Sequence, residues 1–286
     1  MSSKLSWFPA HMHRAMSQLE KRLSEIDIFV EVRDARLPMS SFNKNIDNIL
    51  RLHQKKKIVI FNKWDLCDPD MTRRVQEELT VIGIPSLKMD AKMRKLDMPE
   101  LISTCRKHSS EKFSTVGMWM MVGGIPNVGK SAIVNGLRVL AKNFENNAVS
   151  KSSPKPCQTT HVTGFKVSAN PVVYLVDTPG IFLPYIENEL MAMDLGLIGT
   201  LRSSIIGNLK LIDHLYNRVG KQRVDNIARK WCLTTRPKSG EDLLHRTMEA
   251  FKLADLDAAC EKLLEAFREG EFGRITLDSV HVKIKH

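Results

Sequence analysis

One run of the chain, GIPNVGKS from Gly124 to Ser131, has a spacing that dictates a chemistry. A glycine, four residues and then Gly-Lys-Ser form the pattern of a phosphate-binding loop. Its backbone N–H groups can surround a polyphosphate, while Lys130 supplies a positive charge and the Ser131 hydroxyl takes one site on Mg²⁺. The bland alternative is a Gly-rich turn. The residues predicted to bind nucleotide here are Asn127, Val128, Gly129, Lys130, Ser131 and Ala132.

The elements around this loop fit that chemistry. Residues 118–122 are an apolar run suited to a buried strand, and residues 132–140 have the periodicity of a helix. The N-terminus of such a helix would face the anion. We therefore predict a catalytic role for Lys130, which the loop holds beside the phosphates.

A second motif, NKWD, directly follows the apolar strand predicted over residues 58–61. The Asp65 carboxylate can accept two hydrogen bonds from the N1–H and the exocyclic amine of guanine, a pattern that adenine does not offer. Taken alone, four such residues are more often a polar turn. Beside a phosphate loop, they predict that Asn62, Lys63 and Asp65 bind a guanine nucleotide.

A third and weaker motif, MDAK, follows the strand predicted over residues 84–89. At that position the backbone of Ala91 can contact the guanine O6 atom, and Lys92 belongs to the same turn. Asp90 stands where a serine or a similar residue is usual. Ala91 and Lys92 are therefore predicted nucleotide-binding residues.

Two stretches after the phosphate loop resemble nucleotide switches. Residues 143–161 are polar and lack periodicity, so we expect a loop there. Within it, Thr159 is the candidate that reaches Mg²⁺ and the γ-phosphate, with a catalytic role, and Thr160 is the alternative. The run DTPG follows a VVYLV strand, so Asp177 is expected to hold Mg²⁺ through water and the Gly180 N–H to bind the γ-phosphate.

Composition narrows the class of protein. The chain has 286 residues, of which 43% are hydrophobic, enough for a proper core. Its net charge of +11 favours nucleic acid or an anionic membrane surface as a partner. The 5 cysteines are scattered and read as free thiols. The longest apolar run is too short to span a bilayer, so no transmembrane segment is expected.

Strands and helices alternate up to about residue 186, which predicts a mostly parallel, doubly wound α/β sheet. The remainder, residues 187–286, reads as a small all-α domain. We therefore predict two domains, 1–186 with an N-terminal helix and 187–286. The helices expected in the second domain are 190–200, 205–219, 224–231, 241–252 and 256–267, with Ser239 and Asp255 as N-caps.

Much of the positive charge lies in residues 202–238, which hold nine Lys or Arg against two Asp. Such a concentration predicts a polyanion-binding surface, and a solvated helical face is the alternative. The residues predicted to contact RNA are Lys221, Arg223, Arg229 and Lys230.

The order of the motifs is unusual, because the guanine-reading motif precedes the phosphate loop by about sixty residues. Ordinary guanine-nucleotide switches have the opposite order, and circular permutation of a compact fold explains the difference. With WFPAHM, DARLP and a GRITLDSV tail, the whole chain resembles the circularly permuted ribosome-assembly GTPases of the YlqF/RbgA type, and among them the mitochondrial members. Ala10 and Cys157 stand where that family usually has glycine.

This resemblance implies a circularly permuted P-loop GTPase domain followed by a helical domain. It implies hydrolysis of GTP to GDP on the maturing large ribosomal subunit, with its rRNA and proteins as partners, and release afterwards. It places the protein in the mitochondrial matrix, with peripheral association with the inner membrane. The residue after DTPG is Ile181, which cannot orient water, so the resemblance points to His11 as the catalytic residue. It also implies K⁺ bound by Asn127.

Several alternatives remain open from the sequence. The protein can be a nucleotide-gated, RNA-binding component of the particle with low turnover, or a GTPase of a cytosolic or nuclear ribosome. His11 and His13 can simply pack at a helix start. Asn127 can be a turn-favouring residue and nothing more.

Overall fold

The computed structural model describes residues 17, 19–90, 97–109, 117–147, 164–169, 172–176 and 186–278. Its sheet has six strands in the order β3-β2-β1-β4-β6-β5. All neighbouring pairs are parallel except β5 with β6. The strands are β1 (Ile28–Asp34), β2 (Lys56–Asn62), β3 (Ser86–Met89), β4 (Met118–Gly123), β5 (Gly164–Ala169) and β6 (Val172–Val176). The predicted mostly parallel α/β fold is therefore confirmed.

Both faces of this sheet are covered by helices, as a doubly wound fold requires. The helices are α2 (Lys44–Leu52), α3 (Pro69–Val81), α4 (Asp97–His108) and α5 (Lys130–Asn147). Val30 of β1 shares a buried cluster with Leu101 of α4 and Leu137 of α5. On the other face, Phe29 packs in a cluster with α2, and Phe61 of β2 packs in one with α3.

Residues 186–278 are mainly helical, as the sequence predicts. Its helices are α6 (Glu189–Leu197), α7 (Ser203–Ile206), α8 (Asn208–Val219), α9 (Lys221–Lys230), α10 (Gly240–Phe251) and α11 (Leu256–Glu269). Two predicted N-caps are confirmed: the Ser239 hydroxyl accepts from the Asp242 N–H at 3.1 Å, and Asp255 accepts from the Ala258 N–H at 2.8 Å. We call this region the helical part and the sheet with its helices the α/β part.

Two expectations about local structure are wrong, and one helix is missed. The expected helix over residues 205–219 is divided into α7 and α8, because Gly207 adopts a φ of 97° between them. The expected loop from residue 143 begins later, since α5 continues to Asn147. The sequence reading also misses α2, although Asn43 caps it by accepting from the Asn45 and Ile46 N–H groups.

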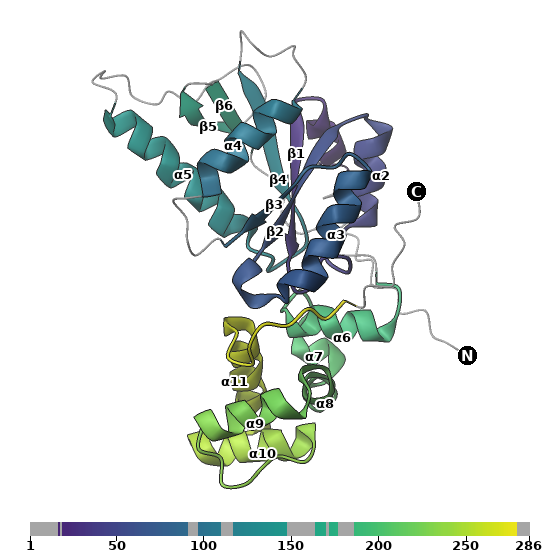
Figure 1. Ribbon diagram of the computed structural model, residues 1–286, viewed down its shortest axis with the longest axis vertical. Helices are drawn as coiled ribbons and strands as arrows, with labels where there is room; N and C mark the ends of the chain where they lie inside the picture. The colour runs from purple at the N-terminus through teal and green to yellow at the C-terminus, as the bar shows by residue number, and fades with distance from the viewer. Residues whose placement is uncertain are drawn as a thin grey trace.

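The two parts of the molecule lie end to end, and the chain crosses between them twice (Figure 1). After α11, residues 271–278 run back toward the α/β part instead of ending in the helical part. Among the residues that the structure describes, no helix is both long and apolar enough to cross a membrane. Cys67, Cys105, Cys232 and Cys260 are free thiols, in agreement with the sequence reading.

Candidate functional site

Three loops meet at one edge of the sheet, because β2, β1 and β4 are parallel neighbours. They follow Asp34 at the end of β1, Asn62 at the end of β2, and Gly123 at the end of β4. From β1 the chain order continues to β2 and β3 on one side, and from β4 it continues to the strands on the other side. The switch point of the sheet therefore lies between β1 and β4. Open α/β sheets bind ligands outside the carboxyl ends of their strands at such a point.

The phosphate loop bridges β4 and the start of α5, as its pattern predicts. Asn127 has a φ of 63° and Gly129 a φ of 100°, both in the left-handed region. A Cβ atom on Gly129 would lie 2.1 Å from the Asn62 Nδ2 atom, so only glycine fits there. Val128 is buried and Ser131 is exposed at the first turn of α5. The Ala132 N–H bonds the Gly129 carbonyl at 3.1 Å.

The ammonium group of Lys130 bonds a backbone carbonyl of the phosphate loop itself. Its Nζ atom donates to the Ile125 carbonyl at 2.6 Å. Burial lowers the pKa of Lys130 to about 8, because the charged form loses solvation there. A bound polyphosphate would restore the charge that this position disfavours.

The NKWD motif is tied directly to the phosphate loop. Asn62 is buried, and its Nδ2 atom donates to the Val128 carbonyl at 2.7 Å. Lys63 donates to the Asn127 carbonyl at 2.7 Å. These two predicted nucleotide-binding side chains therefore fix the relative position of two loops that the chain separates by more than sixty residues. Asp65 lies next to them in the 3₁₀ turn η1 (Trp64–Leu66).

Next to this contact, Asp34 forms an ion pair with Arg36 that the sequence analysis did not predict. Asp34 accepts from Arg36 at 3.0 and 2.8 Å, and Lys63 lies 3.1 Å from the same carboxylate. Burial alone would raise the pKa of Asp34, but the charges of Arg36 and Lys63 outweigh it and hold that pKa well below its usual range. The available signal was the run of charged residues, RDAR, directly after an apolar strand.

The helical part also contacts the phosphate loop. The Asn127 side-chain amide donates to the Gly199 carbonyl, and the Thr200 hydroxyl donates to the Pro126 carbonyl at 3.0 Å. Arg268 of α11 holds the preceding turn by donating to the Gly196 and Leu197 carbonyls, both at 3.0 Å. The sequence reading misses this contact, because it extends the helix to residue 200 whereas α6 ends at Leu197.

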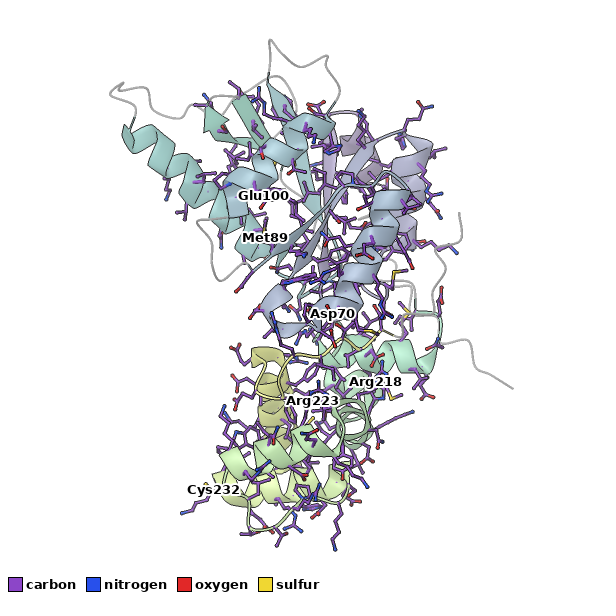
Figure 2. All side chains as sticks on the ribbon, viewed as in Figure 1. Asp70, Met89, Glu100, Arg218, Arg223 and Cys232 are labelled. Carbon is purple, nitrogen blue, oxygen red and sulfur yellow. The ribbon has the colours of Figure 1, made fainter. Side chains whose placement is uncertain are left out.

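The four residues predicted to contact RNA all lie on α9. Three of them bond within the protein: Arg223 with the Arg274 carbonyl at 3.0 Å, Arg229 with Asn226 at 2.7 Å, and Lys230 with Glu271 at 2.8 Å. Lys221, Arg229 and Lys230 are exposed. In Figure 2, Arg223 lies nearer to the sheet than Cys232, which lies toward the far end of the helical part.

Six predicted site residues lie outside the described part of the chain: His11, Ala91, Lys92, Thr159, Asp177 and Gly180, as does the alternative Thr160. Within the described residues, no cluster of His, Cys, Asp or Glu has the arrangement of a metal site. The Ser131 hydroxyl is a hard oxygen donor, as Mg²⁺ prefers. The strand β6, which precedes Asp177, pairs with β4 at Met121↔Val176, close to the phosphate loop.

A phosphate loop after β4 and an Asn-Lys-x-Asp turn after β2, joined at the switch point of a parallel sheet, define a P-loop GTPase in circularly permuted order. Residues 120–239 match the family model described as a 50S ribosome-binding GTPase. Ribosome biogenesis GTPase A of Bacillus licheniformis is 31% identical over 236 residues, which cover 77% of this chain and 79% of that protein. The chain belongs to the ribosome biogenesis GTPase A family.

Other relatives agree in length and fold. Mitochondrial ribosome-associated GTPase 1 of Xenopus tropicalis is 28% identical over 300 residues, covering 95% of this chain and 94% of that protein. The crystal structure of GNP-bound YlqF from T. maritima superposes with a TM-score of 0.64 at 20% identity, covering 93% of this chain and 97% of that one. The structural likeness establishes the shared fold, and the family makes this chain a GTPase that uses a guanine nucleotide.

Proposed function

We propose that this GTPase is an assembly factor that binds the large subunit of the mitochondrial ribosome during its maturation and leaves after GTP hydrolysis. Its relatives carry the names ribosome biogenesis GTPase A and mitochondrial ribosome-associated GTPase 1. The net charge of +11 suits an rRNA partner. The mitochondrial matrix is the proposed location, with peripheral contact to the inner membrane, and the cytosol is the alternative.

The observation that carries this proposal is the contact between the helical part and the phosphate loop. Asn127 and Pro126 lie in the loop that would surround the phosphates, and both bond the turn at Gly199 and Thr200. A change in the loop on hydrolysis is therefore transmitted to the helical part by direct hydrogen bonds. This route adds to the covalent connection that leads in the sequence from DTPG to α6. The basic helix α9 shares a buried cluster with α6 and α8, so the same movement can reach it.

The roles within the site follow from the chemistry of each residue. Asp65 reads guanine, Lys130 and the loop N–H groups hold the phosphates, and the backbone of Ala91 with Lys92 completes the base site. Ser131, Thr159 and Asp177 hold Mg²⁺, which neutralises the charge that develops on the phosphates.

A potassium ion at Asn127 is the further cofactor that we propose. The amide nitrogen of Asn127 faces the Gly199 carbonyl, so its oxygen is the atom left to ligate a cation. The φ of 63° at Asn127 also suits a turn-favouring residue, because asparagine tolerates this conformation well. Comparing K⁺ with Na⁺ separates the two roles.

One assay tests these proposals together. Phosphate release is measured with and without large-subunit particles, in matched K⁺ and Na⁺ buffers, for the unaltered chain and for His11→Ala. We expect stimulation by particles, faster turnover in K⁺, and loss of the stimulated rate in His11→Ala with nucleotide binding unchanged. A chain that binds particles but releases no phosphate is instead a nucleotide-gated, RNA-binding component. Equal rates in both buffers reject K⁺, and a full rate in His11→Ala rejects its catalytic role.

A further inference from the structure

The C-terminal tail, residues 273–278, runs along the loops that form the guanine site. Its backbone pairs with them: the Ile275 N–H donates to the Leu66 carbonyl at 2.9 Å, and the Leu277 N–H donates to the Arg36 carbonyl at 2.8 Å. The side chains of Ile275 and Leu277 are buried. The tail therefore packs on the α/β part, although it follows α11 in the chain.

Polar side chains of the tail bond backbone atoms of the same loops. Arg274 donates from Nε to the Asp65 carbonyl at 3.1 Å. Thr276 accepts from the Asp68 N–H at 3.1 Å, and Asp278 accepts from the Met39 and Ser40 N–H groups at 2.6 and 3.0 Å. These hydrogen bonds restrict the backbone of the loops after β1 and β2, so the tail helps to hold both loops in one conformation.

The turn that carries Asp65 is consequently held at both ends. On one side, Lys63 bonds the phosphate loop. On the other, the carbonyls of Asp65 and Leu66 bond the tail. The end of α11 also packs on this turn, because a Cβ atom on Gly270 would lie 2.5 Å from the Leu66 side chain.

We propose that Arg274 is a positioning residue that sets the direction of the Asp65 carboxylate, and so makes the tail part of the guanine specificity of the site. The aspartate side chain has only two rotatable bonds, and the rotamers open to it depend on its backbone φ and ψ, so the conformation of the turn limits where its two oxygens point. Reading two donors of guanine at once requires both oxygens in place, and a displacement of about 1 Å is costly in such sites. This inference rests on Asp65 being the guanine reader.

Two substitutions of Arg274 separate the hydrogen-bond donor at Nε from the positive charge. In glutamine, the Nε2 atom is as many bonds from the backbone as the Nε atom of arginine, so Arg274→Gln keeps the donor to Asp65 without the charge. Arg274→Met gives a side chain as long as that of glutamine but without the donor. Arg274 is exposed, so neither change opens a cavity. Arg73→Met is the control, since Arg73 is a half-exposed arginine of α3 that pairs with Asp70 in the same helix.

The experiment measures the affinities of the full chain for GTP and for inosine triphosphate. Inosine lacks the exocyclic amine and so forms one of the two hydrogen bonds to Asp65. We expect Arg274→Met to weaken GTP binding roughly fivefold to tenfold and inosine triphosphate binding less than about twofold, so that the preference for GTP shrinks. Arg274→Gln and Arg73→Met should keep that preference.

An unchanged preference in Arg274→Met, or an equal loss in Arg274→Gln, overturns the positioning role. Asp65→Asn distinguishes this from a failure of the underlying assignment. If Asp65→Asn loses GTP while Arg274→Met keeps the preference, only the role of Arg274 is wrong. If Asp65→Asn binds GTP normally, Asp65 does not read the base and both ideas fail.

Discussion

The charged side chains at the carboxyl edge of the sheet differ from those on α9. At the edge, Asp34 and Arg36 are almost fully buried and bond each other. Asp34 also pairs with Lys63, and Arg36 also donates to the Phe267 carbonyl. On α9, Lys230 is largely exposed and pairs with a carboxylate that is itself partly exposed. Buried charges with several partners fix geometry, whereas exposed ones supply a field that salt screens. The first region is suited to one small ligand and the second to a polyanion.

The largest effect should come from the buried pair. Asp34→Asn leaves the charges of Arg36 and Lys63 without their counterion, which we expect to lower the free energy of unfolding by about 3–5 kcal/mol. Asp225→Asn breaks the surface pair of α9 with Arg236 and should cost less than about 1 kcal/mol. Urea unfolding of both variants measures the difference. Similar losses would contradict the contrast between the two regions.

Guanine recognition should depend on a single carboxylate at the edge. Asp65→Asn removes the bidentate contact, so we expect GTP binding to weaken by about 100-fold and xanthosine triphosphate, which offers a carbonyl in place of the amine, to bind better. Titration with both nucleotides tests this. GTP binding as tight as that of the unaltered chain would reject Asp65 as the base reader.

The charges of α9 should act on particle binding and leave nucleotide binding alone. Glutamine at positions 221, 223, 229 and 230 together should weaken binding of the GTP-analogue form to large-subunit particles and reduce the salt slope by up to about 3. The reduction should be smaller than four full charges give, because Glu271 already pairs with Lys230. Sedimentation with particles across salt measures it. An unchanged slope, or equal binding of the GDP form, makes α9 a solvated surface.

The smallest effect concerns the protonation of Lys130. Its pKa in the free protein is about 8, below the usual 10.5, and a bound polyphosphate favours the charged form. Above pH 8, nucleotide binding must therefore take up a proton. We expect affinity to fall by up to about tenfold from pH 8 to pH 9. Calorimetry in buffers of different ionisation enthalpy detects the proton, and Lys130→Met should abolish the uptake.

The sequence predicts much of the fold because its signals are local. Apolar runs mark β1, β2 and β4, and capping residues such as Ser239 and Asp255 mark helix starts within one turn. The predicted helix boundaries are wrong where the backbone conformation of one residue interrupts an apolar periodicity. Gly207, at a φ of 97°, divides a continuous apolar periodicity into α7 and α8.

In the candidate site too, the residues could be predicted from local motifs, whereas the contacts between distant segments could not. Asn62, Lys63 and the phosphate loop could be chosen from motif spacing, because phosphate and guanine chemistry requires fixed residue types in a fixed order. Their bonds to each other, from Asn62 to Val128 and from Lys63 to Asn127, could not be predicted from either motif. They depend on β2, β1 and β4 being neighbours in the sheet.

The sequence by itself determined that this protein is a GTPase with its motifs in permuted order, and it predicts a guanine reader, a phosphate loop and a basic helical region. Only the tertiary structure decided that the helical part bonds the phosphate loop through Gly199 and Thr200, and that the tail returns to hold Asp65. The physical reason is that a motif specifies what its own residues can bind. Contacts between distant segments depend on how the sheet and the helices pack, which no local pattern encodes.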